Sequence, residues 1–209
     1  FFRNNYERAL SQMPNILSQA TVEELEVWIT NRNNATQNVR DVVAFMDMGE
    51  ISPYSSDIQA VGNNTVPDNG ANDLYSRLTA NVDYRRNDQI INVLQSGAFN
   101  LDASTDYEKI YARKLNPSEY TLEPNLGYIS LNTTLQPNQV LAVAYKYNYN
   151  GQVYQVGELS RNVPPDSSSV PKVLYLKLLK STTQSPRLPT WDLMMKNVYS
   201  LGAFQISPD

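Results

Sequence analysis

The stretch VLAVAYKYNYNGQVYQVGE, residues 140–158, decides the fold. It contains two runs, Val140 to Asn148 and Gln152 to Glu158, in which apolar or aromatic residues alternate with polar ones. Such alternation is typical of a β-strand with one dry face. The pair Asn150-Gly151 between the runs accepts the positive φ angles of a type I′ turn. The stretch therefore predicts a β-hairpin.

Further strands are predicted on both sides of this hairpin. The run Val42 to Met46 is continuously apolar, which predicts a strand covered on both faces. Residues 107–115 alternate aromatic or aliphatic with charged side chains, as a strand with one dry face does. The predicted strands outside the hairpin are residues 21–30, 39–48, 107–115, 173–179 and 203–209.

Short helices interrupt this β pattern. Residues 3–13 carry apolar side chains at helical spacing, and Pro14 ends that pattern. Asn72-Asp73 and Asp88 each precede apolar residues at helical spacing, which predicts two helix starts between residues 72 and 96. Residues 52–72 are rich in Pro, Gly, Ser, Asn and Asp and predict a long irregular loop. Residues 191–199 are predicted to be helical or extended.

The predicted fold class is α+β and predominantly β, with antiparallel sandwich-like sheets and a few short helices. The chain is long enough for one domain or for two small subdomains. The division with two subdomains has a β-rich unit at residues 1–115, with a helical insertion near 72–96, and a second β-rich unit at 116–209 with the hairpin 140–158. The first residues contain no initiator Met and the last ones resemble a strand, so we expect an interior piece of a longer protein.

Composition excludes most familiar catalysis. The chain has no Cys and no His, which removes thiol nucleophiles, the Ser-His-Asp triad and the usual zinc sites. Its net charge of −4 and scattered Lys and Arg argue against nucleic-acid binding. No run of 18 apolar residues is present, so no transmembrane helix is predicted. We expect no enzyme, no cofactor and no metal site, in a water-soluble segment.

The 14 tyrosines and two tryptophans are the main candidates for a binding surface. Aromatic side chains can stack on sugar rings or on a partner's side chains, and they can equally be core residues. The residues considered for this interaction surface are Trp28, Tyr145, Tyr147, Tyr149 and Trp191.

Acidic residues allow two other hypotheses, and each is weaker than a structural interpretation. Asp68-Asn69-Gly70 supplies oxygen ligands for Ca²⁺ but lacks the spacing of an EF-hand loop, so a turn is favoured. Asp102 with Asp106, or the group Glu23, Glu24 and Glu26, could supply paired carboxylates for glycoside hydrolysis. Nothing in the sequence brings such a pair together across a substrate.

Several stretches together resemble one protein family. They are EVWITNR at 26–32, RDVVAFMDMGE at 40–50, YTLEPNLGYISLN at 120–132, the hairpin with VGE at 156–158, and WDLMMKNVY at 191–199. These stretches are similar to the SprA/Sov family, the outer-membrane translocon of the Bacteroidetes type IX secretion system. The resemblance extends along most of the chain.

This resemblance implies a domain of a giant outer-membrane β-barrel that exports folded cargo and takes part in gliding motility. The domain itself would be periplasmic, luminal or extracellular. The implied partners are proteins: the rest of the parent translocon, a plug protein, a PorV-like shuttle and secreted cargo. The matching stretches include no catalytic residue, so a structural or protein-interaction module is expected. The alternative is a carbohydrate-binding β-sandwich of a surface glycan-binding protein.

Overall fold

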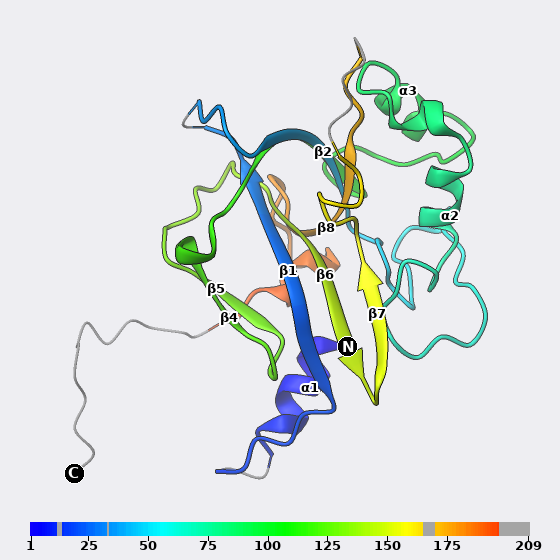
Figure 1. Ribbon diagram of the computed structural model, residues 1–209. Helices are drawn as coiled ribbons and strands as arrows, with labels where there is room; N and C mark the ends of the chain where they lie inside the picture. Colours follow the sequence, from blue (N-terminus) through cyan, green and yellow to red (C-terminus); the bar gives the residue numbers. More distant parts are fainter. Residues whose placement is uncertain (12–13, 33, 165–169, 197–209) are drawn as a thin grey trace.

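The computed structural model describes residues 1–11, 14–32, 34–164 and 170–196, and its main feature is one six-stranded sheet (Figure 1). The strands of this sheet are β1 (Ala20–Thr30), β2 (Val39–Phe45), β3 (Tyr107–Lys114), β6 (Leu141–Tyr149), β7 (Gln152–Val156) and β8 (Leu174–Lys180). Their order is β1-β3-β2-β8-β6-β7. The neighbours are antiparallel except β2 and β8, which are parallel.

An additional pairing between β1 and β6 closes five of these strands into a ring, here named the closed sheet. Trp28 pairs with Lys114 of β3 on one side and with Ala142 of β6 on the other. The interior is filled by alternate side chains of the five strands. Those from β1, β3 and β6 include the large Trp28 beside the small Ala112, Ala142 and Ala144. The small residues leave the space that the indole fills.

Three elements cover the outer faces of the closed sheet (Figure 1). Residues 46–106, here named the insertion, contain α2 (Leu74–Thr79), the 3-10 helix η1 (Val82–Arg85) and α3 (Ile90–Gln95), and they pack on β2 and β8. The hairpin of β4 (Tyr120–Glu123) and β5 (Tyr128–Leu131) packs on β1 and β6. Helix α1 (Phe2–Ala9) lies near the β6–β7 turn. The short 3-10 helices η2 (Pro117–Glu119) and η3 (Pro189–Leu193) complete the described elements.

The predominantly β, α+β fold is confirmed, and so are most of the predicted elements. Asn150 and Gly151 have φ angles of 52° and 83°, as a type I′ turn requires. Val42 to Phe45 are fully buried on both faces, as their continuous apolar run predicts. The β4–β5 hairpin was not predicted, because its two four-residue strands show no clean alternation. The predicted strand at 203–209 lies outside the described residues, as do residues 197–199 of the segment predicted at 191–199.

The two predicted subdomain ranges contribute to the same sheet. Strands β1, β2 and β3 come from residues 1–115, and β6, β7 and β8 come from 116–209. The pairings of β1 with β6 and of β2 with β8 join the two ranges by backbone hydrogen bonds. The boundary at residue 115 therefore does not separate two sheets.

Candidate functional site

The insertion leaves and re-enters the closed sheet at neighbouring positions. The Met46 N–H donates to the Asp106 carbonyl at 2.8 Å, directly after β2 and directly before β3. Its helices bury Leu74, Leu78 and Ile90 against the sheet. Such burial of large aliphatic side chains contributes about 1.5–3 kcal/mol per residue relative to exposure. The insertion is therefore a long connection between the antiparallel neighbours β2 and β3, and it packs on the closed sheet.

A buried ion pair fixes the insertion to the sheet. Glu158, which follows β7, is only 1% exposed. Arg85 of η1 donates from Nη1 to its Oε2 at 2.8 Å and from Nη2 to its Oε1. The Tyr75 hydroxyl donates to Glu158 Oε1 at 3.1 Å, and the Tyr175 N–H donates to Oε2 at 3.0 Å. Burial, reinforced by the nearby Glu158 carboxylate, raises the pKa of Tyr75 to about 12. Charged and polar groups thus satisfy one another in a dry setting.

A second polar cluster holds the start of the insertion. Lys177 of β8 is buried, and its Nζ donates to the Met46 carbonyl and to Glu50 Oε1. Asn72 donates from Nδ2 to the Asp47 and Glu50 carbonyls, at 2.8 Å each. Together with the Arg85–Glu158 pair, these contacts are here named the polar clamp. The clamp joins the turn after β2 to β7, β8 and the first helix of the insertion.

The loop at 52–72 covers the outer edge of β7. Asp68 Oδ2 accepts from the Gln155 N–H at 3.1 Å, and the Asn69 N–H donates to the Gln155 carbonyl at 2.9 Å. The Asn69 side chain also bonds the Gly157 N–H at 2.8 Å and the Gly157 carbonyl at 3.1 Å. Asp68 Oδ1 accepts from the Gly70 N–H at 2.9 Å, so the residues weighed as calcium ligands form the favoured turn. The loop thereby protects an edge strand.

The predicted interaction surface is wrong for two of its members. Trp28 is buried in the closed sheet, and its Nε1 donates to Glu26 Oε2 at 3.3 Å. Tyr147 is fully buried, and its hydroxyl donates to the Pro67 carbonyl at 2.7 Å. Burial raises the pKa of Tyr147. Side chains that are only 2% and 0% exposed cannot stack on a sugar or a partner, so Trp28 and Tyr147 belong to the core.

Tyr145 and Tyr149 are half-buried on the same side of β6, and residues 1 and 2 cover them. The Phe1 ring centroid lies 5.3 Å from that of Tyr149, and the Phe2 centroid lies 5.6 Å from that of Tyr145. Burial also raises the pKa of Tyr145. The sequence interpretation missed Phe1 and Phe2. The available signal was that Phe1 and Phe2 are apolar and directly precede the helical pattern predicted at residues 3–13.

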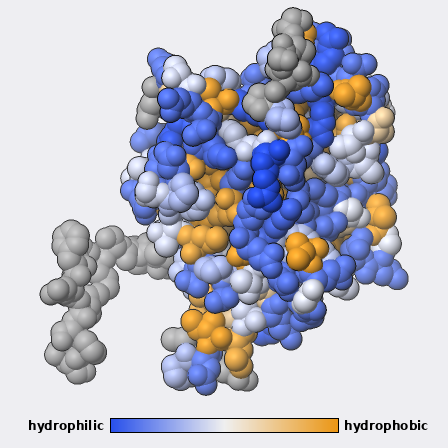
Figure 2. Space-filling view, viewed as in Figure 1, coloured by the Kyte–Doolittle hydropathy of each residue, from blue (hydrophilic) through white to orange (hydrophobic). Residues whose placement is uncertain are grey.

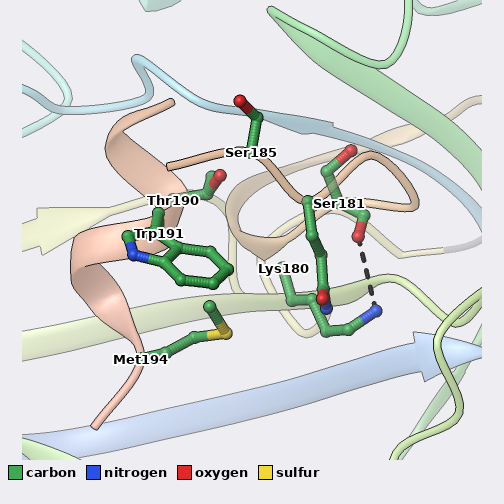
Figure 3. A pocket seen from close by; sticks show the side chains of 7 residues that line it. Lys180, Ser181, Ser185, Thr190, Trp191 and Met194 are labelled. Atoms are coloured by element: carbon green, nitrogen blue, oxygen red, sulfur yellow. Dashed lines mark hydrogen bonds between the residues drawn. The ribbon is translucent and has the colours of Figure 1, made fainter. Parts of the chain in front are cut away.

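Trp191 lies apart from this aromatic group, on η3, where it is half-buried (Figure 3). With Met194 it lines a small cavity beside Lys180 and Ser181. The cavity has a volume of about 10 Å³, which is room for about one water molecule. A sugar ring does not fit there. The five predicted residues therefore do not form one platform.

Three of the carboxylates weighed for catalysis, those of Asp106, Glu26 and Glu24, make structural contacts. Asp106 Oδ2 accepts from the Asp102 N–H at 2.8 Å, and burial raises the pKa of Asp106. Glu26 accepts from the Ser160 N–H at 3.0 Å and from its hydroxyl at 2.7 Å. Glu24 forms an exposed ion pair with Arg161. Within the described residues, no group of three or more acidic side chains is placed to hold a metal ion.

In the comparison with known proteins, no protein-family model and no curated protein matches the chain. Among the described helices, none has both the length and the apolar character needed to cross a membrane.

Proposed function

We propose that this chain is a non-catalytic domain of an outer-membrane translocon of the SprA/Sov family, which acts in type IX secretion and gliding motility. In this proposal the closed sheet is a scaffold and the insertion is the surface it presents. The partners are the parent translocon, its plug protein, a PorV-like shuttle or secreted cargo. The domain works by shape and contact rather than by chemistry at a reactive centre.

One observation carries this proposal: two of the stretches that carry the family resemblance, 40–50 and 156–158, meet at the polar clamp. Asp47 to Glu50 belong to the stretch at 40–50, and Val156 to Glu158 close the hairpin. Gly49 and Val156 are in such close contact that a Cβ on Gly49 would lie 2.9 Å from both Val156 methyl carbons. Segments more than 100 residues apart in the sequence thus build one joint, and their polar residues hold the insertion in place. This use of polar groups favours an architectural role.

The outward side of the insertion offers residues for contact with a partner. Val82 of η1 and Ile91 of α3 have exposed fractions of 62% and 40%. The Tyr84 and Phe99 rings of the insertion pack on each other, with their centroids 5.9 Å apart. Loops and short helices on a rigid scaffold are where proteins most often carry binding residues. Val82 and Ile91 are therefore the first residues to test.

A capture experiment tests the proposed role. The tagged chain is incubated with detergent-solubilised envelopes of its own organism, and bound proteins are identified by mass spectrometry. We expect a plug, PorV-like or cargo protein to be recovered by the unchanged chain and by V153S, an exposed control on β7. Recovery by V82S/I91S should be lost, because both apolar contacts become polar.

A second experiment decides the outcome in cells. Deletion of this segment from the parent should reduce secretion of type IX cargo. Normal secretion without the segment, or recovery of surface glycan machinery in place of translocon proteins, would overturn the proposal.

A further inference from the structure

Helix α1 lies on a face built from the β6–β7 hairpin and the turn between β4 and β5. Tyr145, Tyr147 and Tyr149 project from the same side of β6, since alternate residues of a strand share a face. Tyr154 of β7 stacks on Tyr147 with ring centroids 5.5 Å apart. The turn between β4 and β5 supplies the other wall. This surface, made by the three tyrosines of β6 together with Asn125, Gly127 and Tyr128, is here named the docking face.

Two adjacent phenylalanines fill the docking face. The Phe2 centroid lies 5.2 Å from that of Tyr147 with the rings at 69°, and 5.6 Å from that of Tyr145 with the rings at 77°. Phe1 meets Tyr149 at 5.3 Å and 83°. These edge-to-face arrangements are the favourable ones for aromatic pairs. The face is therefore complementary to two successive aromatic side chains.

The β4–β5 turn leaves room for the second ring. Gly127 has a φ of +72°, and a Cβ at this position would lie 2.1 Å from Phe2 Cδ1. Any other residue would therefore displace the ring. One helical turn further along α1, Tyr6 meets Tyr128 of β5 with centroids 6.0 Å apart. Both contacts involve the same short hairpin.

A buried amide fixes the register of α1. Asn5 is buried on the face of α1 that also buries Ala9. Its Nδ2 donates to Ser18 Oγ at 3.0 Å and to the Asn125 carbonyl at 3.3 Å. A buried amide needs such partners, because an unsatisfied one costs about 1–3 kcal/mol. The docking face thus contacts two successive aromatic rings, an Asn three residues after the second ring, and the Tyr that follows this Asn.

Helix α1 depends on this docking for its structure. Four of its side chains, those of Arg3, Asn4, Glu7 and Arg8, are exposed, and only Asn5 and Ala9 are buried. Figure 2 shows hydrophobic side chains at the bottom of the view, near α1, and in the segment after the helix Ile16 and Leu17 are 49% and 63% exposed. The helix is therefore a docked element that can leave without breaking a strand of the sheet.

We infer that the docking face is a binding site for a helix that carries two successive aromatic residues, in the pattern Phe-Phe-x-x-Asn-Tyr. In the described structure residues 1–9 of the chain itself occupy the site. A partner helix of the same chemistry takes their place when it is supplied from another chain. This inference rests only on the contacts that α1 makes, so it does not depend on the proposed role in a translocon.

A peptide supplied in trans tests this site. The probe is a labelled peptide of residues 1–10, and the receiving protein is the full chain carrying F1A/F2A, whose own α1 lacks both rings. We expect the peptide to bind this variant. It should bind the unchanged chain roughly tenfold more weakly or worse, because the tethered α1 competes at a high effective concentration. A peptide with both Phe residues replaced by Ala should bind neither chain.

The chain carrying F1A/F2A/G127A locates the site, since the new methyl group occupies the position of the Phe2 ring. Loss of binding there is expected. Binding that persists in this variant, or no binding to a folded F1A/F2A chain, would overturn the inference. Loss of the sheet in F1A/F2A would overturn it as well, because α1 would then be part of the core rather than a docked element.

Discussion

The insertion and α1 both cover outer faces of the closed sheet, but different chemistry holds them there. The insertion is joined by the buried Arg85–Glu158 pair, and its Arg85 carbonyl accepts from the Val173 N–H at 2.8 Å. Helix α1 is joined by ring contacts and by the Asn5 amide. Detaching the insertion would break the Arg85–Glu158 pair and also expose the aliphatic side chains of Leu74, Leu78 and Ile90, whereas release of α1 exposes rings and one amide. The first element is integral to the fold, and the second is a removable cover.

The largest expected effect comes from breaking the clamp. Glu158→Ala leaves the Arg85 guanidinium buried beside Tyr175 without its carboxylate, and we expect a loss of about 3–5 kcal/mol in the free energy of unfolding. Urea denaturation measures it. The matched control is Glu24→Ala, which removes the exposed pair with Arg161 and should cost about 0–1 kcal/mol. Equal losses in the two variants would contradict the distinction between the two coverings.

The second effect concerns α1 and uses two glycines. Gly127→Ala places a methyl group on the Phe2 ring and also strains a positive φ. Gly151→Ala strains a similar φ of +83°, but its methyl group meets nothing within 4 Å. Backbone strain alone costs about 1–2 kcal/mol of the free energy of unfolding. We expect a larger loss in Gly127→Ala, because the Phe2 ring is also displaced from the rings of Tyr145 and Tyr147. Amide hydrogen exchange over residues 2–9 should accelerate only in Gly127→Ala.

The β4–β5 hairpin is held less firmly than the insertion and more firmly than α1, because one half-buried ion pair joins the start of the hairpin to β3. Arg113 donates to Glu119 at 2.7 and 2.8 Å, and these bonds lower the pKa of Glu119 from 4.5 to about 2. A depressed carboxyl pKa stabilises the fold above the unfolded value and loses that effect as the pH falls from about 4.5 through 2. With partial exposure, we expect about 1–2 kcal/mol at pH 7.

Unfolding of the unchanged chain and of Glu119→Gln, compared at pH 7 and near pH 2, measures this contribution. The stability difference between the two proteins should shrink at the lower pH. A difference that stays constant across this range would assign the stabilisation to something other than the charged carboxylate.

The smallest expected effect concerns the hydrogen bond between the insertion and Tyr147 of β6. Tyr147→Phe removes the hydroxyl that donates to the Pro67 carbonyl at 2.7 Å and should cost about 1 kcal/mol. Tyr149→Phe, at a half-buried position of the same strand, is the control and should change stability by less than about 0.5 kcal/mol. Thermal unfolding of both variants would show the difference. No difference would mean that this contact does not hold the loop.

The sequence predicted the features that depend on local chemistry. The Asn150-Gly151 turn, the doubly buried β2 and the start of α2 after Asn72-Asp73 each follow from residues close together in the chain. The parallel pairing of β2 with β8 and the closure of β1 onto β6 do not, because they join strands more than 100 residues apart. Arg85 and Glu158 are 73 residues apart and carry no pattern that pairs them.

The predicted aromatic surface illustrates the same limit. Alternation in β1 indicates that Trp28 shares a face with its neighbours two residues away, but it does not say which face is dry. Only closure of the sheet places the indole inside. The alternation in β6 places Tyr145, Tyr147 and Tyr149 on one face, but the ring pair that contacts them comes from residues 1 and 2, far away in the sequence.

Amide hydrogen exchange of the unchanged chain tests the contrast between the two coverings most directly. We predict that α2 and α3 exchange at the rate of β6, since the clamp makes them open only with the sheet. Residues 2–9 should exchange much faster, through local release of α1. Protection of α1 equal to that of β6, or release of α2 and α3 before α1, would contradict this account.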